Sequence, residues 1–340
     1  MILVLNCGSQ SIKWKVFDEK MKVVQEGKRA ILAQEDFQKC LEQEFGGIDR
    51  TKVNLIGHRV VHGGNKFASP IKITEENLAE LEKLNYLAPL HNPFNILGMK
   101  VCQKIFQQAT QVAVFDTAFF KDLPETAFIY ALPEAIAKEF GFRRYGFHGI
   151  SQEYVTKKAA ELVKKPLNKL KVITCHLGGG ASISAINKGK VIDTSMGFTP
   201  LEGLVMMTRS GNVDAGIVLE LVREFSLDRA KEILNKESGV KGICGEGEML
   251  KVLEMVKAGD LKAKLALDVF AYSVKKYIGA YFAILGGCDV LVFTGAIGFG
   301  SEKIRKLICK DLDILKKTKV LAIKTDEELA IATKILNNKF

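Results

Sequence analysis

Two stretches of the chain share one pattern of apolar and polar positions. The first has an apolar run at residues 2–5 and an alternating run at 12–17, and the second repeats this at 172–175 and 183–186. A short polar turn containing glycine joins the two runs in each copy. Alternation with a period of two is typical of half-buried strands, and a tight turn between them predicts a hairpin. We interpret the recurrence as a duplication of one α/β domain rather than a coincidence between two ordinary hairpins.

The remaining segments predict a mixture of helices and strands. Apolar residues spaced three and four apart predict amphipathic helices over residues 74–87, 93–108, 215–225 and 262–285. Uniformly apolar runs predict buried strands at residues 54–58, 111–115 and 289–293. A chain of 340 residues is long enough for two hydrophobic cores. The expected fold class is therefore α/β, with two domains.

Composition and charge restrict the partners without changing this picture. The formal charge is +10, but the basic residues are scattered and form no long tract interleaved with aromatics. We therefore expect anionic small molecules as partners, and no nucleic acid. The seven cysteines form no CxxC pair, and the longest apolar stretch, around residues 281–293, is too short to span a membrane. A cytoplasmic protein that binds no membrane is expected.

The candidate chemistry lies in short segments rich in glycine and histidine. Glycine-containing turns follow apolar strands at residues 6–11, 178–182 and 295–301. Such turns can direct backbone N–H groups at phosphate oxygens, although none matches a P-loop or a Rossmann fingerprint. All five histidines lie in motif-like stretches beside glycine, arginine or asparagine, which favours loops that converge on a polar cleft. Their spacing does not favour a metal site made of histidines.

Three charged residues complete this set: Arg59, Arg209 and Asp116. Phosphoryl transfer needs positioning, cations near the phosphoryl oxygens, and a carboxylate that holds magnesium or the nucleophile. Each residue taken alone is better explained by a surface ion pair or a helix cap. Together with the glycine turns they predict an enzyme that transfers a phosphoryl group between a nucleotide and a small anionic acceptor.

Long motifs in the chain closely resemble the acetate kinase (acetokinase) family. The segments that carry the resemblance lie at residues 6–13, 58–64, 87–93, 114–119, 144–149, 176–182, 193–203, 208–211 and 293–298. The resemblance implies two duplicated actin-like (ribonuclease H-like) domains with a nucleotide cleft between them. It places an N-terminal acyl-kinase domain at residues 1–147 plus 325–340 and a C-terminal nucleotide-binding domain at 148–324. It also implies a homodimer.

The resemblance further implies an activity and roles for individual residues. The activity is reversible, Mg²⁺-dependent transfer between ATP and acetate, giving acetyl phosphate and ADP by direct in-line attack. The implied catalytic residues are Asp116, Arg59, Arg209 and His148, and the implied metal-binding residues are Asn6 and Asp116. The implied binding residues for the acid are Arg59, Val61, Leu90, His91, Phe147 and Pro200. Those for the nucleotide are Lys13, His176, Gly178, Gly179, Gly180, Ser182, Gly295, Ala296, Ile297 and Gly298.

Several positions depart from the family pattern. Phe299 replaces a glutamate that helps to bind magnesium, and a phenyl ring cannot ligate a hard cation. Glu302 is a possible substitute for that ligand. Gln152 and Phe120 each replace a histidine, and Gln10 replaces a serine. Two alternatives stay open: a kinase for propionate or another short acid, and a degenerate nucleotide-binding paralogue without catalysis.

Overall fold

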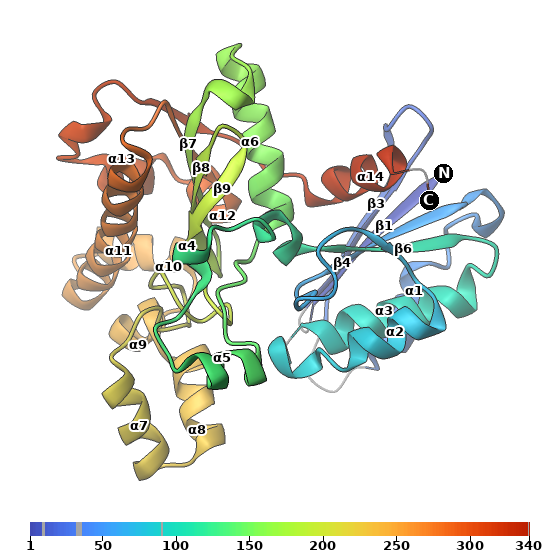
Figure 1. Cartoon of the computed structure of the whole chain (residues 1–340), viewed down its shortest axis with the longest axis horizontal. Helices are drawn as coiled ribbons and strands as arrows, with labels where there is room; N and C mark the ends of the chain where they lie inside the picture. The colour runs from blue at the N-terminus through green and yellow to red at the C-terminus, as the bar shows by residue number, and fades with distance from the viewer. Residues whose placement is uncertain (9–10, 32–35, 90, 339) are drawn as a thin grey trace. The chain divides into compact units, whose positions relative to one another are not determined.

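The computed structural model describes the chain except for residues 9–10, 32–35, 90 and 339, and it contains two units, each built on one sheet (Figure 1). Unit 1 comprises Met1–Lys121, Phe147–Ser151 and Asp326–Phe340. Unit 2 comprises Asp122–Gly146 and Gln152–Thr325. Residues 122–146 thus group with the second sheet, whereas the domain border expected from the sequence lies at 147/148. That border stays a prediction.

Unit 1 contains a six-stranded sheet in the order β3-β2-β1-β4-β6-β5. Its strands are β1 (Ile2–Gly8), β2 (Ser11–Phe17), β3 (Val23–Ala30), β4 (Leu55–Val60), β5 (Ile71–Lys72) and β6 (Thr110–Phe115). β1 pairs antiparallel with β2 and parallel with β4. The helices α1 (Phe37–Glu44), α2 (Glu75–Glu82) and α3 (Asn92–Ile105) lie on one face, and α14 (Glu327–Asn337) covers the other (Figure 1).

The burial of β1 on both faces explains its continuous apolar run. Leu3 and Leu5 belong to the core cluster formed with α1 and α3. Ile2 and Val4 belong to the cluster formed with α14, which also contains Ile331. Alternate side chains of a strand point to opposite faces, so a strand with helices on both sides needs apolar residues at every position.

Unit 2 contains a five-stranded sheet in the order β9-β8-β7-β10-β11. Its strands are β7 (Lys171–Leu177), β8 (Ala181–Asn187), β9 (Lys190–Thr194), β10 (Val290–Thr294) and β11 (Lys319–Ala322). β7 pairs antiparallel with β8 and parallel with β10, as β1 does with β2 and β4. The two sheets therefore repeat one strand order, which confirms the duplication predicted from the two hairpins.

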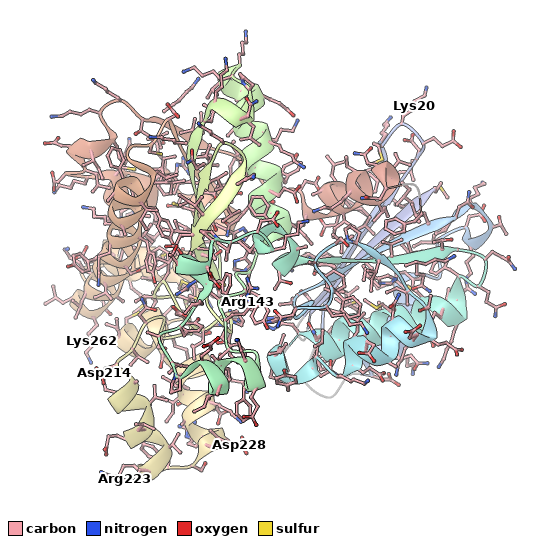
Figure 2. The ribbon with its side chains drawn as sticks, viewed as in Figure 1. Lys20, Arg143, Asp214, Arg223, Asp228 and Lys262 are labelled. Carbon is pink, nitrogen blue, oxygen red and sulfur yellow. The ribbon has the colours of Figure 1, made fainter. Side chains whose placement is uncertain are left out.

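Helices surround this second sheet and extend from it. They are α4 (Glu125–Phe128), α5 (Glu134–Phe140), α6 (Gly149–Val163), α7 (Ala215–Glu224), α8 (Leu227–Glu232), α9 (Gly239–Cys244), α10 (Met249–Lys257), α11 (Leu261–Leu285), α12 (Gly295–Gly300) and α13 (Glu302–Cys309). Among the residues that the structure describes, no helix is long and apolar enough to cross a bilayer. All seven cysteines are free thiols. Charged side chains such as Lys20, Arg223 and Asp228 project outward (Figure 2), in keeping with a scattered basic excess.

Two details of the expected glycine turns are wrong. Residues 6–8 lie within β1 and residues 181–182 lie within β8, so the first two turns are shorter than the sequence indicated. Residues 295–300 form helix α12 instead of a turn. Gly295 adopts φ of +76°, so that this single residue completes the change of direction after β10 and the helix can start at once.

His58 is a core residue of β4, so the expectation that all five histidines line a polar cleft is wrong for this one. Its side chain is 1% exposed, and its Nε2 lies 2.7 Å from Oε1 of Gln111 on β6. Burial lowers the pKa of His58 from 6.5 to about 4, although the Gln111 bond opposes the shift. The neutral imidazole is therefore part of the fold.

The buried imidazole predicts a loss of stability in mild acid. The unfolded chain binds a proton at His58 near pH 6.5, whereas the folded chain does so only near pH 4. The stabilisation is therefore complete above pH 6.5 and is lost as the pH falls toward 4, by about 2 kcal/mol between pH 7 and pH 5. Urea unfolding at both pH values measures this. In the variant His58→Gln, the free energy of unfolding should change by about 2 kcal/mol less between these pH values. An equal change in both proteins would contradict a buried neutral His58.

Candidate functional site

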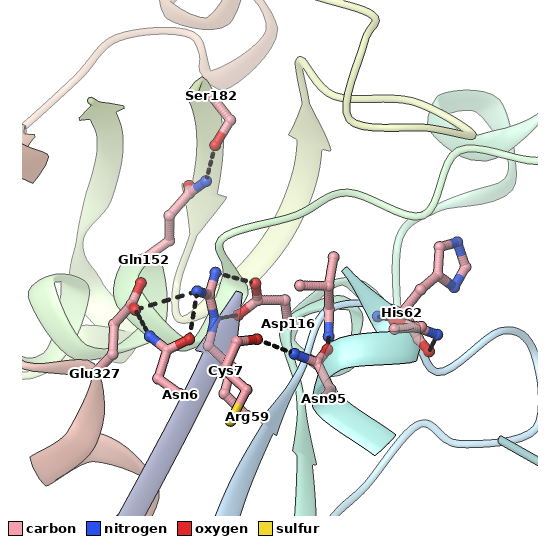
Figure 3. Close-up of polar contacts among 11 residues, drawn as sticks. Asn6, Cys7, Arg59, His62, Asn95, Asp116, Gln152, Ser182 and Glu327 are labelled. Atoms are coloured by element: carbon pink, nitrogen blue, oxygen red, sulfur yellow. Dashed lines mark hydrogen bonds and ion pairs between the residues drawn. The ribbon is translucent and has the colours of Figure 1, made fainter. Parts of the chain in front are cut away.

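A buried ion pair lies where two neighbouring parallel strands of unit 1 end. Arg59 is near the end of β4, and Asp116 directly follows β6. Nη2 of Arg59 lies 2.6 Å from Oδ2 of Asp116, and Nε lies 3.3 Å from Oδ1 (Figure 3). The Asp116 side chain is 1% exposed. The strand order therefore brings together two predicted catalytic residues, as ends of parallel strands commonly do in α/β folds.

Asn6 and Glu327 complete a polar cluster around Arg59. Nη1 of Arg59 donates to Oδ1 of Asn6 at 3.2 Å, and Nδ2 of Asn6 donates to Oε2 of Glu327 at 3.3 Å (Figure 3). The same Glu327 oxygen lies 3.6 Å from Nη1 of Arg59. We call Asn6, Arg59, Asp116 and Glu327 the Arg59 cluster. Its carboxylate and amide oxygens, gathered around one guanidinium, could accept a cation or orient an anionic substrate.

Sequence reasoning missed Glu327. The acidic run at residues 326–328 is typical of the first turn of any helix, and α14 does begin there. Asp326 caps this helix by accepting the N–H of Leu329 at 3.0 Å, and both its carboxylate oxygens accept from Nζ of Lys15. These bonds fix the first turn of α14, which carries Glu327 into the Arg59 cluster.

The electrostatics of the cluster follow from burial and proximity. Burial alone would lower the pKa of the Arg59 guanidinium, but Asp116 and Glu327 more than offset it and the pKa is raised. Burial also raises the pKa of Asp116; Arg59 opposes this shift and the Glu327 carboxylate adds to it. Arg59 thus stays charged, and Asp116 accepts a proton more readily than an ordinary aspartate. Perturbed groups of this kind are typical of functional sites.

The turn that carries His148 packs directly against Asp116. His148 adopts φ of +59°, a left-handed conformation that is uncommon outside glycine. The N–H of Ile150 donates to the Asp116 carboxylate. A Cβ atom on Gly149 would lie 2.0 Å from the Asp116 carbonyl oxygen, so only glycine allows this approach. The structure therefore brings His148 to the same strand end as Arg59 and Asp116.

Among the residues predicted to bind the acid in unit 1, Val61 directly follows β4, whereas His91 and Phe147 precede α3 and α6. Val61 and Phe147 are buried, and the Phe147 ring packs edge-on against His62 with centroids 5.4 Å apart. The N–H of Val61 donates to Oδ1 of Asn95 on α3, while the carbonyl of His91 accepts the N–H of Asn95. Leu90, also predicted here, lies outside the described residues. Asn95, which sequence reasoning missed, links the segments of Val61 and His91.

The predicted nucleotide residues of unit 2 form two adjoining segments. The turn after β7 is closed by the N–H of Gly178, which donates to the carbonyl of Gly180 at 2.9 Å. Gly295 packs so closely on this strand that a Cβ would lie 2.5 Å from the Leu177 carbonyl oxygen. Residues 176–182 and 294–298 thus lie side by side through the pairing of β7 with β10. Lys13 belongs instead to β2 of unit 1, directly opposite Asn6.

A buried amide fixes the strands on either side of the Gly178–Gly180 turn. Nε2 of Gln152, on α6, donates to Oγ of Ser182 at 2.7 Å (Figure 3). Its Oε1 accepts from Oγ1 of Thr174 on β7, also at 2.7 Å. A glutamine amide offers a donor and an acceptor at once. These two hydrogen bonds explain how an uncharged glutamine is accommodated where the family pattern has histidine.

Arg209 lies in the irregular segment between β9 and α7. Its Nη1 donates to the carbonyl of Pro200 at 3.3 Å, which joins two predicted site residues. Burial lowers the pKa of Arg209. The N–H of Met207 donates to the carbonyl of Gly179 at 3.3 Å, so this segment adjoins the Gly178–Gly180 turn within unit 2. A buried guanidinium beside a glycine turn is suited to an anionic ligand.

The residues considered for the altered magnesium position lie on α12 and α13. Phe299 is partly exposed, and its carbonyl accepts from Nη1 of Arg305 at 2.6 Å. The Glu302 carboxylate is exposed and pairs with Lys306 at 2.7 Å. Among the described residues, no group of three or more His, Cys, Asp or Glu side chains is arranged to hold a metal.

Comparisons with known proteins identify the family of the chain. The profile of the acetokinase family matches residues 33–338. Acetate kinase of Carboxydothermus hydrogenoformans is 43% identical over an alignment of 390 positions, with 98% of each chain covered. Acetate kinase of Porphyromonas gingivalis has a TM-score of 0.89 at 36% identity, covering 99% of this chain and 98% of its own. A propionate kinase of Francisella tularensis has the same TM-score and identity, with 98% of each chain covered. The chain, with its duplicated actin-like fold, belongs to the acetokinase family.

Proposed function

We propose that the chain is an acetate kinase, which transfers a phosphoryl group reversibly between ATP and acetate. The observation that carries this proposal is the Arg59 cluster of a chain that belongs to the acetokinase family. In this cluster the buried Arg59 guanidinium contacts two carboxylates, those of Asp116 and Glu327. Phosphoryl transfer depends on positioning and on charge stabilisation rather than on covalent chemistry by the protein. The Arg59 cluster supplies both.

The site residues have three roles in the proposed reaction: binding, orientation and charge stabilisation. An acetate oxygen attacks the γ-phosphorus in line; a new P–O bond forms while the bond to the oxygen shared with ADP breaks. Arg59 and Arg209 neutralise the carboxylate and the phosphoryl oxygens, and Asp116 orients the attacking carboxylate. His148 donates a hydrogen bond to the transferring group. In the reverse direction the same groups orient acetyl phosphate and ADP.

Magnesium fits the oxygen donors of the Arg59 cluster. Asn6 and Asp116 are the ligands expected from the sequence, and we add Glu327, because its Oε2 lies 3.3 Å from Nδ2 of Asn6. Mg²⁺ commonly takes one or two carboxylates and fills its remaining positions with water and phosphate oxygens. When bound it would neutralise phosphate charge. Because Phe299 cannot be a ligand, we assign the acidic ligand role to Glu327.

The nucleotide role of unit 2 rests on its backbone. The N–H groups around Gly178–Gly180 and at the start of α12 come from adjoining strands, and glycine leaves room for close approach. His176 and Ser182 face each other in the register of β7 and β8 and border this turn. We propose that these segments bind ATP and ADP. The cleft expected between the two domains stays a prediction.

Acetate is preferred over longer acids in this proposal because the predicted acid-binding residues are bulky and buried. Val61 and Phe147 are both less than a tenth exposed. The similarity to a propionate kinase supports propionate as the alternative substrate. One added methylene changes the discrimination between two acids by only about 1–3 kcal/mol. The second alternative, a paralogue without catalysis, is disfavoured by the retention of Arg59, Asp116, His148 and Arg209.

The homodimer and the cytoplasmic location also remain proposals. Large apolar side chains are exposed on helices of unit 2, which favours contact with a partner. They include Ile217, Leu219, Phe225, Leu261, Leu265 and Tyr272. Sedimentation analysis at several protein concentrations would test the dimer, and a monomer at all of them would contradict it.

The decisive experiment is the formation of acetyl phosphate from ATP, Mg²⁺ and acetate, trapped as the hydroxamate. We expect turnover by the natural chain and a loss of at least about 10³-fold in Arg209→Ala, because a cation that stabilises transition-state charge contributes on that scale. Propionate measured in parallel decides between the two acids. Tight ATP binding without turnover on either acid would overturn the kinase and favour the paralogue.

A further inference from the structure

The segment that carries Pro200 and Arg209 is long and irregular. Residues 195–214 contain neither helix nor strand, although Ser195 and Met196 are fully buried. An irregular segment of this length inside a packed unit needs side-chain partners for its backbone, because no sheet or helix satisfies them. The question is which side chains hold it in place.

Three side chains from separate segments of unit 2 meet on this loop. Nη2 of Arg144 donates to Oε1 of Glu202 at 2.7 Å, and the hydroxyl of Tyr130 donates to Oε2 of the same carboxylate. Tyr130 also accepts the N–H of Phe198 at 2.8 Å, and Nη1 of Arg144 donates to the carbonyl of Ser195 at 3.3 Å. We call Tyr130, Arg144 and Glu202 the Glu202 cluster. It fixes the loop through two backbone groups and one carboxylate.

The packing around the Glu202 cluster is close. A Cβ atom on Gly197 would lie 1.7 Å from Oε2 of Glu202 and 2.1 Å from the Tyr130 hydroxyl. The side chains of Arg144 and Glu202 are 17% and 30% exposed, so their ion pair is partly shielded from water. A shielded, hydrogen-bonded pair of this kind holds one geometry better than an exposed pair does.

The loop connects the Glu202 cluster to Arg209. Glu202 follows Pro200 by two residues, and the Pro200 carbonyl accepts Nη1 of Arg209 at 3.3 Å. The loop is closed beyond Glu202 by Asn212, whose Oδ1 accepts the N–H of Gly203 at 2.9 Å. A shift of the loop at residue 202 would therefore move the oxygen that orients the Arg209 guanidinium.

We propose that Tyr130, Arg144 and Glu202 are positioning residues that hold the Arg209 guanidinium in its working orientation through the 195–212 loop. The inference rests on the proposed function, because it assigns Arg209 to the transferring phosphoryl group. None of the three residues contacts the substrates in this scheme. Their removal should lower kcat and leave the binding of ATP unchanged.

The test compares Glu202→Gln in two backgrounds. In the natural chain we expect kcat to fall about 10- to 100-fold, since displacement of a catalytic group by about 1 Å costs on that order. In Arg209→Lys, whose ammonium cannot reproduce the planar fork, the same change should cost less than about threefold. KM for ATP should stay within about twofold throughout. Arg229→Gln, which removes the exposed pairs with Glu232 and Glu237, is the matched control and should change nothing.

An equal loss in both backgrounds would overturn the inference, and so would a lower melting temperature with unchanged kcat. Amide hydrogen exchange over residues 195–212 gives a readout that needs no turnover, and Glu202→Gln should accelerate it at residues 206–210. If the natural chain makes no acetyl phosphate, the proposed function fails, and unchanged exchange in this variant separately refutes the positioning role. Turnover by the natural chain together with an unaffected Glu202→Gln refutes the positioning role alone.

Discussion

Replacement of Asp116 by asparagine should reduce kcat for acetyl phosphate formation by about 10³-fold, because a preorganised charge at the reacting centre contributes on that scale. Asparagine keeps the size of the side chain, but it cannot offer two charged oxygens to Nε and Nη2 of Arg59. The acetate carboxylate would then meet a guanidinium that is held by one neutral amide oxygen at position 116 together with Asn6 and Glu327. Steady-state kinetics with acetate and ATP varied independently measure the loss.

Stability must be followed in the same variant. Removal of one partner of a buried pair leaves the other charge undercompensated, at a cost of about 3–5 kcal/mol where no second partner exists. Here the Glu327 carboxylate stays 3.6 Å from Arg59. We therefore expect a loss in the free energy of unfolding at or below the lower end of that range. Asp228→Asn is the matched control, because this carboxylate is 95% exposed and pairs only loosely with Lys231. Asp116→Asn with kcat within threefold of the natural chain would contradict a direct role for Asp116 in the reaction.

The part of the fold that depends on local pattern could be predicted from the sequence. The two hairpins have a period of two and a glycine turn, and they appear as β1-β2 and β7-β8 in equivalent places of two sheets. Helix α11 was expected at 262–285 and occupies Leu261–Leu285. These elements could be predicted because the spacing of apolar residues within each segment shows which of its faces is buried.

The parts that depend on distant contacts could not be predicted in the same way. Asn6 and Glu327 share a hydrogen bond although 321 positions separate them in the chain. Nothing in the local pattern of residues 326–328 distinguishes a ligand from an ordinary acidic first turn, since acidic residues are favoured there in any helix. Similarly, the sequence shows Glu202 only as a charged residue in a loop. Its contacts with Tyr130 and Arg144 are visible only in the structure. The family resemblance identified most candidate residues, and the fold identified their partners.

Phe299 illustrates a departure whose consequence depends on the fold. By itself the loss of the family's glutamate suggests a weakened magnesium site. The structure places three oxygen-bearing side chains in the Arg59 cluster, all of them from unit 1, whereas Phe299 belongs to α12 of unit 2. Magnesium binding in our proposal is therefore retained without that glutamate.

Replacement of Gly149 by alanine should both destabilise unit 1 and lower activity. The new methyl group would lie 2.0 Å from the Asp116 carbonyl oxygen and 2.8 Å from Cβ of Phe119. The first of these contacts is with backbone, which cannot rotate away, so the first turn of α6 must shift. We expect a loss of about 3 kcal/mol in the free energy of unfolding, at the upper end of ordinary overpacking. Chemical denaturation measures this loss.

The same shift should act on the chemistry, because the turn holds His148 and the Ile150 N–H against Asp116. We expect kcat to fall about 10²-fold in the molecules that remain folded. Gly279→Ala is the matched control: Gly279 is also helical, in α11, but a Cβ there meets no atom within 4 Å. This second alanine should instead stabilise by about 0.5–1 kcal/mol and leave kcat unchanged. If both alanine variants behaved alike, close packing of Gly149 on Asp116 could not be what holds the catalytic turn in place.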